Sequence, residues 1–266
     1  GDHHFADDVV WTGNDRDGFY TSHRFYSVGR NTGPSVYGPP NNVMSHRGGI
    51  ALCYVRENRI IEEWIGRMDQ RNIRSMGYNV EDVVAQFAEA DRNNPKAVEV
   101  HGEIERVVGQ TEPVAYPAQA SEGFDVDYFV RRTMHEVWNR RMLGEIRKAY
   151  APNYLCHGVQ ESYGRGDFTE WVLCMMAAFP DAQFIVDQLF WMDDGGGNYR
   201  TSLRWSILGT HAGDGIFGKA TNVPCRIWGL TQHHIRGGRF VEEYTYFNEL
   251  ALLKRIYLAR NGGLKK

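Results

Sequence analysis

Several features are scarce in this 266-residue chain, and each absence excludes a class of protein. No apolar run approaches the roughly 20 residues that a membrane-spanning helix needs, the longest extending from Trp171 to Phe179. An excess of one charge is also missing, since 30 Lys and Arg face 33 Asp and Glu, a formal charge of −3. We therefore expect neither membrane insertion nor nucleic-acid binding through a broad basic field, and residues 1–4 do not resemble a secretion signal.

Cysteine is scarce as well, with four residues far apart and no C-x-x-C pair. This spacing favours buried thiols in a reducing cytoplasm over a disulfide framework or a zinc knuckle. His233 and His234 are adjacent on a predicted strand and point to opposite faces, so we expect no metal site there. What the chain does contain, 42% hydrophobic and 24% charged residues, is typical of a globular protein of one large or two modest domains.

An internal repeat organises the sequence. Residues 7–77 align with residues 187–257 without a gap and share fifteen identities in 71 positions, against about four expected by chance. Glycines keep their register in both copies, as do Thr21-Ser22 with Thr201-Ser202 and Glu62-Glu63 with Glu242-Glu243. We interpret this as duplication of one domain, in which the first copy lacks the part that precedes the sheet in the second.

The second copy begins with helical periodicity and continues with strand periodicity. Apolar residues at steps of three and four predict an amphipathic helix over 126–150 and a second helix after Asp167. The two helices would form a lid. Alternation then predicts strands near 182–192, 199–207, 222–235 and 239–248, and the first copy repeats them near 5–12, 19–28, 42–55 and 59–68.

This order predicts an α+β fold, with a curved antiparallel sheet wrapped over helices. We divide the chain into a shortened first domain (1–78), a helix and linker (79–125) and a complete second domain (126–260). Asn79 is placed to cap a helix over 81–92, and the prolines and glycines of 93–124 are typical of a linker. We also expect the two sheets to pack on each other as an intrachain pseudo-dimer, with a homodimer as a further option.

The ordered motifs resemble the SnoaL-like polyketide cyclases of the nuclear transport factor 2-like superfamily, which also contains ketosteroid isomerase. The motifs are Phe179-Pro180-Asp181, Gly209-Thr210-His211-x-Gly213 and Arg239-Phe240-Val241-Glu242-Glu243-Tyr244, with Arg59-Ile60-Ile61-Glu62-Glu63-Trp64 as the parallel in the first copy. Two such domains in one chain also resemble a bacterial subgroup of tandem proteins. The resemblance implies a cone-shaped pocket and an aldol ring closure that needs neither metal nor cofactor.

The same resemblance exposes a departure from the family pattern. Its acid/base aspartate stands four residues after the aromatic of the Glu-Trp motif, and these positions hold Met68 and Asn248 here. Asp69 and Glu249 come one place later, where a strand residue faces the opposite side unless a bulge intervenes. The usual cyclase mechanism is therefore in question in both copies.

Three residues remain as candidate catalytic groups in the second domain. His211 matches the histidine of the family's Thr-His-x-Gly segment, although a loop histidine without a function is an alternative. Glu242 becomes the best remaining acid if its face of the strand lines the cone. Asn248 could hydrogen-bond a carbonyl or cap the segment that follows. Candidate substrate-binding residues, with core packing or surface ion pairs as the alternative, are Trp138, Tyr154, Arg204, Tyr244 and Tyr246.

Two functions from different classes fit these residues. The first is a cofactor-independent enzyme that acts on a small hydrophobic carbonyl compound by cyclisation, isomerisation or lyase chemistry in the 126–257 pocket. The second is a non-catalytic protein that binds a hydrophobic ligand or pairs through its sheet, because Met68 and Asn248 replace the acid. In both, the expected partner is a small organic ligand.

Overall fold

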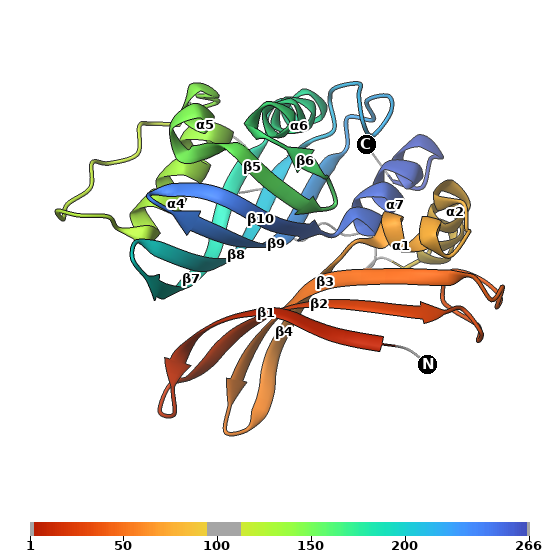
Figure 1. The fold of residues 1–266 in the computed structure, drawn as a ribbon. Coiled ribbons are helices and arrows are strands. Elements are labelled where there is room, and N and C mark those ends of the chain that lie inside the picture. The colour runs from red at the N-terminus through yellow and green to blue at the C-terminus, as the bar shows by residue number, and fades with distance from the viewer. Residues whose placement is uncertain (1–2, 95–112, 265–266) are drawn as a thin grey trace.

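Two sheets cross one above the other, with helices over the second sheet and at one end of the first (Figure 1). The computed structural model describes residues 3–94 and 113–264. The first sheet has the strand order β1-β2-β3-β4, and the second has the order β6-β5-β10-β9-β8-β7. Helices combined with curved, largely antiparallel sheets make this the predicted α+β fold.

The first half forms a four-stranded antiparallel meander of β1 (His3–Asn14), β2 (Gly18–Arg30), β3 (Met44–Arg56) and β4 (Arg59–Arg67). Two helices follow, α1 (Asp69–Ser75) and α2 (Val80–Asp91). The side chain of Asn79 accepts hydrogen bonds from the amides of Glu81 and Asp82, so it caps α2 as the sequence predicts. Of the predicted linker, residues 95–112 lie outside the described residues.

The second half repeats these strands and adds to them. Its strands are β5 (Tyr150–Gly158), β6 (Ser162–Tyr163), β7 (Gln183–Gly195), β8 (Asn198–Thr210), β9 (Pro224–Arg236) and β10 (Arg239–Phe247). The bounds of β8, β9 and β10 equal those of β2, β3 and β4 with 180 added. Strand β5, which runs parallel to β10, is not predicted from the sequence.

The helix predicted over 126–150 is wrong in its second part. Helix α4 (Val126–Met134) continues into one π-helical turn, η2 (His135–Asn139), and the chain leaves helical geometry before α5 (Gly144–Ala149). Arg141 has φ of 58°, a left-handed conformation that a right-handed helix excludes. The apolar spacing of the sequence continues through residues 140–143, because that spacing reflects which side chains are buried and does not require a helical backbone.

The second predicted helix is confirmed as α6 (Arg165–Ala178). Asp167 lies in its first turn and accepts a hydrogen bond from the amide of Tyr163, so it fixes the preceding strand and does not cap the helix. A last helix, α7 (Glu249–Arg260), begins directly after β10 and is not predicted. We call α4, η2, α5 and α6 the lid helices, because they cover one face of the second sheet (Figure 1).

The main core lies between the lid helices and the second sheet. It is built largely from apolar and aromatic side chains at the positions that periodicity assigned to the inner faces. Fully or almost fully buried members include Val130, Val137, Ile146, Tyr150, Tyr154, Val172, Phe179, Leu203, Ile227, Ile235 and Phe240. Burial of this apolar surface is the main force that holds the lid on the sheet.

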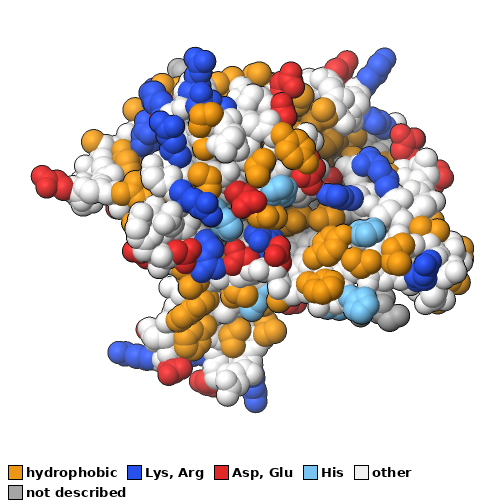
Figure 2. Space-filling view, viewed as in Figure 1, with side chains coloured by type: hydrophobic (Ala, Val, Ile, Leu, Met, Phe, Trp, Pro, Cys, Tyr) orange, Lys and Arg blue, Asp and Glu red, His pale blue; other side chains and the backbone are white. Residues whose placement is uncertain are grey.

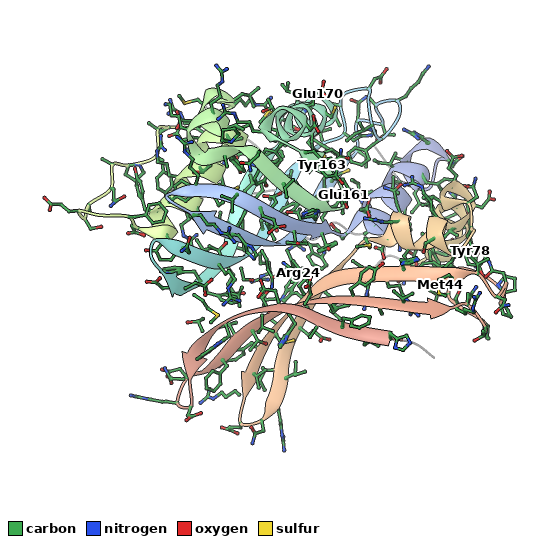
Figure 3. The ribbon with its side chains drawn as sticks, in the orientation of Figure 1. Arg24, Met44, Tyr78, Glu161, Tyr163 and Glu170 are labelled. Atoms are coloured by element: carbon green, nitrogen blue, oxygen red, sulfur yellow. The ribbon has the colours of Figure 1, made fainter. Side chains whose placement is uncertain are left out.

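A second core joins the two sheets. Val10, Ile50 and Leu52 of the first sheet pack against Phe190, Leu230 and Tyr246 of the second. Two cation–π contacts cross the interface in opposite directions: Arg24 lies 3.5 Å from the ring centre of Tyr244, and Arg204 lies 4.3 Å from that of Trp64. Figure 3 shows Arg24 between the sheets. Arg24 corresponds to Arg204 in the repeat, and Trp64 corresponds to Tyr244. The two contacts are therefore equivalent, as in a two-fold symmetric interface.

Charged side chains gather along the edge of this interface (Figure 2). Asp8 of β1 accepts hydrogen bonds from Arg200 at 2.6 Å and His234 at 3.1 Å, both in the second sheet. Burial raises the pKa of Asp8, but these hydrogen bonds and the Arg200 charge outweigh it and lower the pKa to about 2. The first sheet is therefore held to the second by ionic as well as apolar contacts.

Replacing Asp8 with Asn should weaken the folded state at neutral pH and hardly at all near pH 2. Because the folded-state pKa lies below the usual value of 3.8, the carboxylate stabilises the fold above about pH 4, and this stabilisation disappears as the pH falls through 2. We expect a loss of about 1–2 kcal/mol at pH 7, discounted for partial exposure. Urea unfolding at pH 7 and pH 2.5 measures it, and an equal loss at both values would contradict the assignment.

Two further observations concern the environment of the chain. Among the residues that the structure describes, no helix combines the length and apolar character needed to cross a bilayer. All four cysteines are free, and Cys53, Cys156 and Cys225 are buried, as the sequence predicts.

Candidate functional site

A pocket opens between the lid helices and the inner face of the second sheet. Its cavity measures about 50 Å³, room for a few water molecules in this conformation. Aromatic rings, methionines and aliphatic side chains form most of the wall, and strands β9 and β10 contribute polar side chains. The lining residues include Met134, Trp138, Phe168, Trp171, Met175, Phe184, Leu203, Trp205, Ile207 and Phe247.

Glu243 on β10 is the only acidic residue among those that line this pocket. It is 6% exposed, and its Oε1 accepts hydrogen bonds from Thr245 Oγ1 at 3.0 Å and Cys156 Sγ at 3.3 Å. Burial raises the pKa of Glu243, and its hydrogen bonds offset only part of that effect. A carboxyl group whose pKa is raised holds its proton more readily than an exposed one, which favours a role as general acid or base.

His233 on β9 lies beside Glu243 and faces the same pocket. Its Nε2 is 3.5 Å from Glu243 Oε2, and its Nδ1 is 2.8 Å from the hydroxyl oxygen of Thr201 on β8. Burial lowers the pKa of His233 to about 3, so the imidazole is neutral at physiological pH. Cross-strand pairing of Thr201 with His233 and of His233 with Glu243 holds the three side chains in one row.

A third polar group, the hydroxyl of Tyr150 on β5, belongs to the same pocket. Tyr150 is fully buried, and among the described residues its hydroxyl has no hydrogen-bond partner. Burial raises the pKa of Tyr150 well above its usual value, which keeps the hydroxyl protonated and able to donate. Since an unpaired buried hydroxyl costs about 1–3 kcal/mol, it is a natural partner for a carbonyl oxygen of a bound molecule.

Only one of the eight residues selected from the sequence lines this pocket, namely Trp138. Tyr154 is buried behind the wall, edge-on to Tyr150 at 4.8 Å between ring centres. His211 is buried in the loop after β8, between the rings of Phe179 and Phe217, with Nδ1 3.1 Å from Thr221 Oγ1. His211 therefore belongs to the frame of the domain, whereas the Tyr154 hydroxyl acts on Glu243 and offsets part of the burial effect on its pKa.

The remaining candidates face away from the pocket. Glu242, Tyr244 and Tyr246 share the face of β10 that packs on the first sheet, and Arg204 of β8 faces Trp64 there. The condition under which Glu242 was selected, that its face lines the cone, is therefore not met. Asn248 precedes α7 and accepts a hydrogen bond from the amide of Trp228, so it fixes the end of β10.

Sequence reasoning missed Glu243, although a signal for it was present. Leu203, Trp205 and Ile207 marked the odd-numbered face of β8 as apolar, and antiparallel pairing carries that face through Thr231 and His233 of β9 to Glu243 of β10. The row Thr201, His233 and Glu243 lies on that inner face. Extending the alternation across strands would have selected the second glutamate of the pair.

The described residues hold no group of three or more His, Cys, Asp or Glu side chains arranged to bind a metal ion. The chemistry that the pocket residues themselves offer is proton transfer: a carboxyl group, a neutral imidazole and a hydroxyl meet at its polar end. The surrounding apolar wall excludes water and strengthens their electrostatic effect on a bound molecule.

Comparison with known proteins finds similarity in this half of the chain. Residues 129–256 match the family model described as SnoaL-like polyketide cyclase, which supports the resemblance found in the motifs. No curated protein matches the chain.

Solved structures similar to this chain align with about half of it. They include a candidate polyketide cyclase from Acidithiobacillus ferrooxidans, with 23% identity, 52% of this chain and 99% of that chain covered, and a TM-score of 0.44. AclR, a candidate hydroxylase from Streptomyces galilaeus, has 24% identity, 52% and 96% coverage and a TM-score of 0.42. A SnoaL-like polyketide cyclase from Agrobacterium tumefaciens has 12% identity, 50% and 99% coverage and a TM-score of 0.42.

Proposed function

We propose that residues 126–260 form a cofactor-independent enzyme that moves a proton on a carbon next to a carbonyl group of a small hydrophobic compound. The reaction would be of the SnoaL-like cyclase kind, an aldol ring closure, or a related isomerisation or elimination. The observation that carries the proposal is the buried Glu243–His233 pair at the polar end of an apolar pocket. The match of residues 129–256 to the cyclase family model supports the reaction class.

Each polar residue has a role in this mechanism. The Glu243 carboxylate removes the proton from carbon, and the protonated carboxyl returns it to carbon or to oxygen. We assign the Nε2 proton to His233, because the Thr201 hydroxyl can then donate to Nδ1 while Nε2–H faces Glu243. Tyr150 donates to the carbonyl oxygen, where negative charge develops as the proton leaves.

We further propose that the chain is a tandem duplication in which the first half supports the second. The evidence is the 180-residue offset of three strands and the reciprocal contacts of Arg24 and Arg204. In the first half the Glu243 position is occupied by Glu63, which is exposed, and the His233 position by Cys53. Without a buried acid and imidazole, the first half would not catalyse this reaction. The four free cysteines of the chain, three of them buried, fit a cytoplasmic location.

The second candidate function is a non-catalytic binding protein. It is favoured by Met68 and Asn248 at the position of the family acid, and by the small volume of the cavity. In such a protein the Tyr150 hydroxyl would bind a carbonyl oxygen, but no proton would be transferred.

Deuterium exchange separates the two candidates. The purified chain would be incubated in D₂O with acetophenone and related aryl ketones, whose α-hydrogens exchange slowly in buffer, and with cyclisable diketones. The enzyme proposal expects protein-dependent loss of the α-hydrogen signals in NMR, or a cyclised product. Binding detected by thermal shift without exchange or product in any compound would support the binding protein instead.

A further inference from the structure

A second, smaller cavity lies next to the pocket, between the end of α6 and the turn that follows η2. Trp138, Met175, Phe184 and Ile207 line both cavities, so these side chains are shared walls between them. The other wall residues of the small cavity are Arg141, Met176, Phe179 and Ala182. A ligand that displaced these shared side chains would occupy one mainly apolar space, with Glu243 and His233 in its larger part.

Among the described residues that line the small cavity, Arg141 alone is charged, and its side chain is also exposed to solvent. It follows η2 in a left-handed conformation, and one guanidinium nitrogen, Nη2, donates to the carbonyl oxygen of Pro180. This hydrogen bond bridges the lid helices to the start of the β-sheet segment and holds the guanidinium at the cavity. Its other nitrogens remain available to an anion.

The charges around Arg141 leave it free for a ligand. Residues 126–149 contain six Lys or Arg against three Asp or Glu, although the whole chain is negative, and Figure 2 shows basic side chains gathered over α5. The three acids are taken up by ion pairs: Asp127 with Arg131, Glu136 with Arg140, and Glu145 with both Arg132 and Lys148. Within the described residues, no ion pair joins Arg141 or Arg147 to an acid.

The larger pocket has no cationic group in its wall, since none of the described residues that line it is Lys or Arg. An anionic group placed there would lie beside Glu243 in an apolar wall, which is unfavourable. The same group at the small cavity would meet the Arg141 guanidinium. The two ends of the space therefore differ in the part of a molecule that each can accept.

We propose that Arg141 binds an anionic end, a carboxylate or a phosphate, of a ligand whose apolar carbonyl-bearing part occupies the larger pocket. This inference rests on the proposed function for the identity of the pocket, and it restricts the substrate class to amphipathic carbonyl compounds. Such a ligand would pass between Trp138, Phe184 and Met175. Met175 has an unbranched, flexible side chain that adapts to an occupant at low cost.

Binding calorimetry with matched ligands tests the proposal. The probes are 4-oxo-4-phenylbutanoate, its neutral methyl ester and 3-phenylpropyl phosphate, each titrated into the whole chain. We expect at least one anion to bind about fivefold more tightly than the ester, the strength of a partly exposed ion pair. Whether the carboxylate, the phosphate or both show this preference identifies the source of the anion.

Two substitutions locate the effect. Arg141→Gln should bring the affinities for anion and ester to within about twofold, while Arg147→Gln removes a charge from the same lid segment and should leave the preference intact. Equal affinities in the unsubstituted chain, a preference that survives Arg141→Gln, or no binding of any probe would overturn the proposal. Because the readout is binding, the preference can hold even if no compound is turned over, so the proposed function and this inference fail separately.

Discussion

Replacing Glu243 with Gln should lower turnover by about 10²- to 10⁴-fold, the range typical for loss of a positioned acid or base. The amide keeps the size of the side chain and can still contact Thr245 and Cys156, but it cannot accept a proton from carbon. Since burial of the carboxyl group raises its pKa, the neutral amide should not weaken the fold. Steady-state kinetics on the best ketone found by exchange, together with thermal unfolding, provides the measurement.

Glu242→Gln is the matched control for this variant. The two glutamates are adjacent, but Glu242 lies on the opposite face of β10, where its oxygens lie 3.2 Å from His157 Nε2 and 3.1 Å from His234 Nδ1, both of the second sheet. We expect this variant to change the stability of the interface and to keep turnover within about twofold. If Glu242→Gln abolished turnover while Glu243→Gln did not, the assignment of the inner face would be wrong.

The same mechanism predicts the pH dependence of the reaction. The carboxylate is the form that accepts the proton, so kcat should rise with pH as Glu243 ionises, and this rise should be centred above the usual value of 4.5 because burial raises its pKa. The slope should vanish in the residual activity of Glu243→Gln. A profile that falls with pH in the acid range would require a different proton acceptor.

The second large effect is expected at Glu249, the first residue of α7. It is 4% exposed, and burial raises its pKa to about 7, with the charge of Asp69 adding to the effect and the hydrogen bond from Gln70 opposing it. The folded-state pKa exceeds the unfolded value, so the folded chain binds the proton more tightly. The contribution of Glu249 to stability should therefore be highest below about pH 4.5 and decline by about 3 kcal/mol as the pH rises through 7.

Glu249→Gln removes this decline, because the amide carries no charge at any pH. We expect the variant to be about 2–3 kcal/mol more stable than the unsubstituted chain at pH 8 and nearly equal to it at pH 4.5. The Gln70 amide, 2.7 Å from Glu249 Oε1, can donate to the new side chain as well. Urea unfolding across this pH range measures the difference.

An exposed acid provides the comparison. Glu81 occupies the first turn of α2, as Glu249 does in α7, but it is open to solvent. Glu81→Gln should change the free energy of unfolding by less than about 0.5 kcal/mol, with little dependence on pH between 4.5 and 8. A stability profile of Glu249→Gln that runs parallel to that of the unsubstituted chain would show that Glu249 is ionised throughout.

The positions of Asp69 and Glu249 show where the rule of strand alternation no longer holds. The sequence indicated that an acid shifted by one place faces the opposite side of a strand, and that a bulge would be needed to restore it. In the structure, β4 and β10 end at residues 67 and 247, and both acids begin helices. Strand alternation no longer applies to them, and they lie where the two halves meet, linked through Gln70.

Local pattern was sufficient for most of the fold. Alternation placed the eight strands β1–β4 and β7–β10 within about three residues, and the side chain of Asn79 capped a helix where expected. These features depend on short-range periodicity and hydrogen bonding, which residues a few positions apart decide. Two features were not predicted: the end of helical geometry after Asn139, and strand β5. Both depend on contacts of the backbone with distant parts of the domain.

The sequence by itself determined the α+β architecture, and it predicted the repeat that relates residues 7–77 to residues 187–257. The tertiary structure decided which of two adjacent glutamates is buried in the pocket, because a strand has two faces and only packing chooses between them. With the first sheet on one face of β10 and the lid helices on the other, Glu242 becomes an interface residue and Glu243 the acid of the pocket. That choice depends on contacts between residues as far apart as Asp8 and His234, which no local pattern encodes.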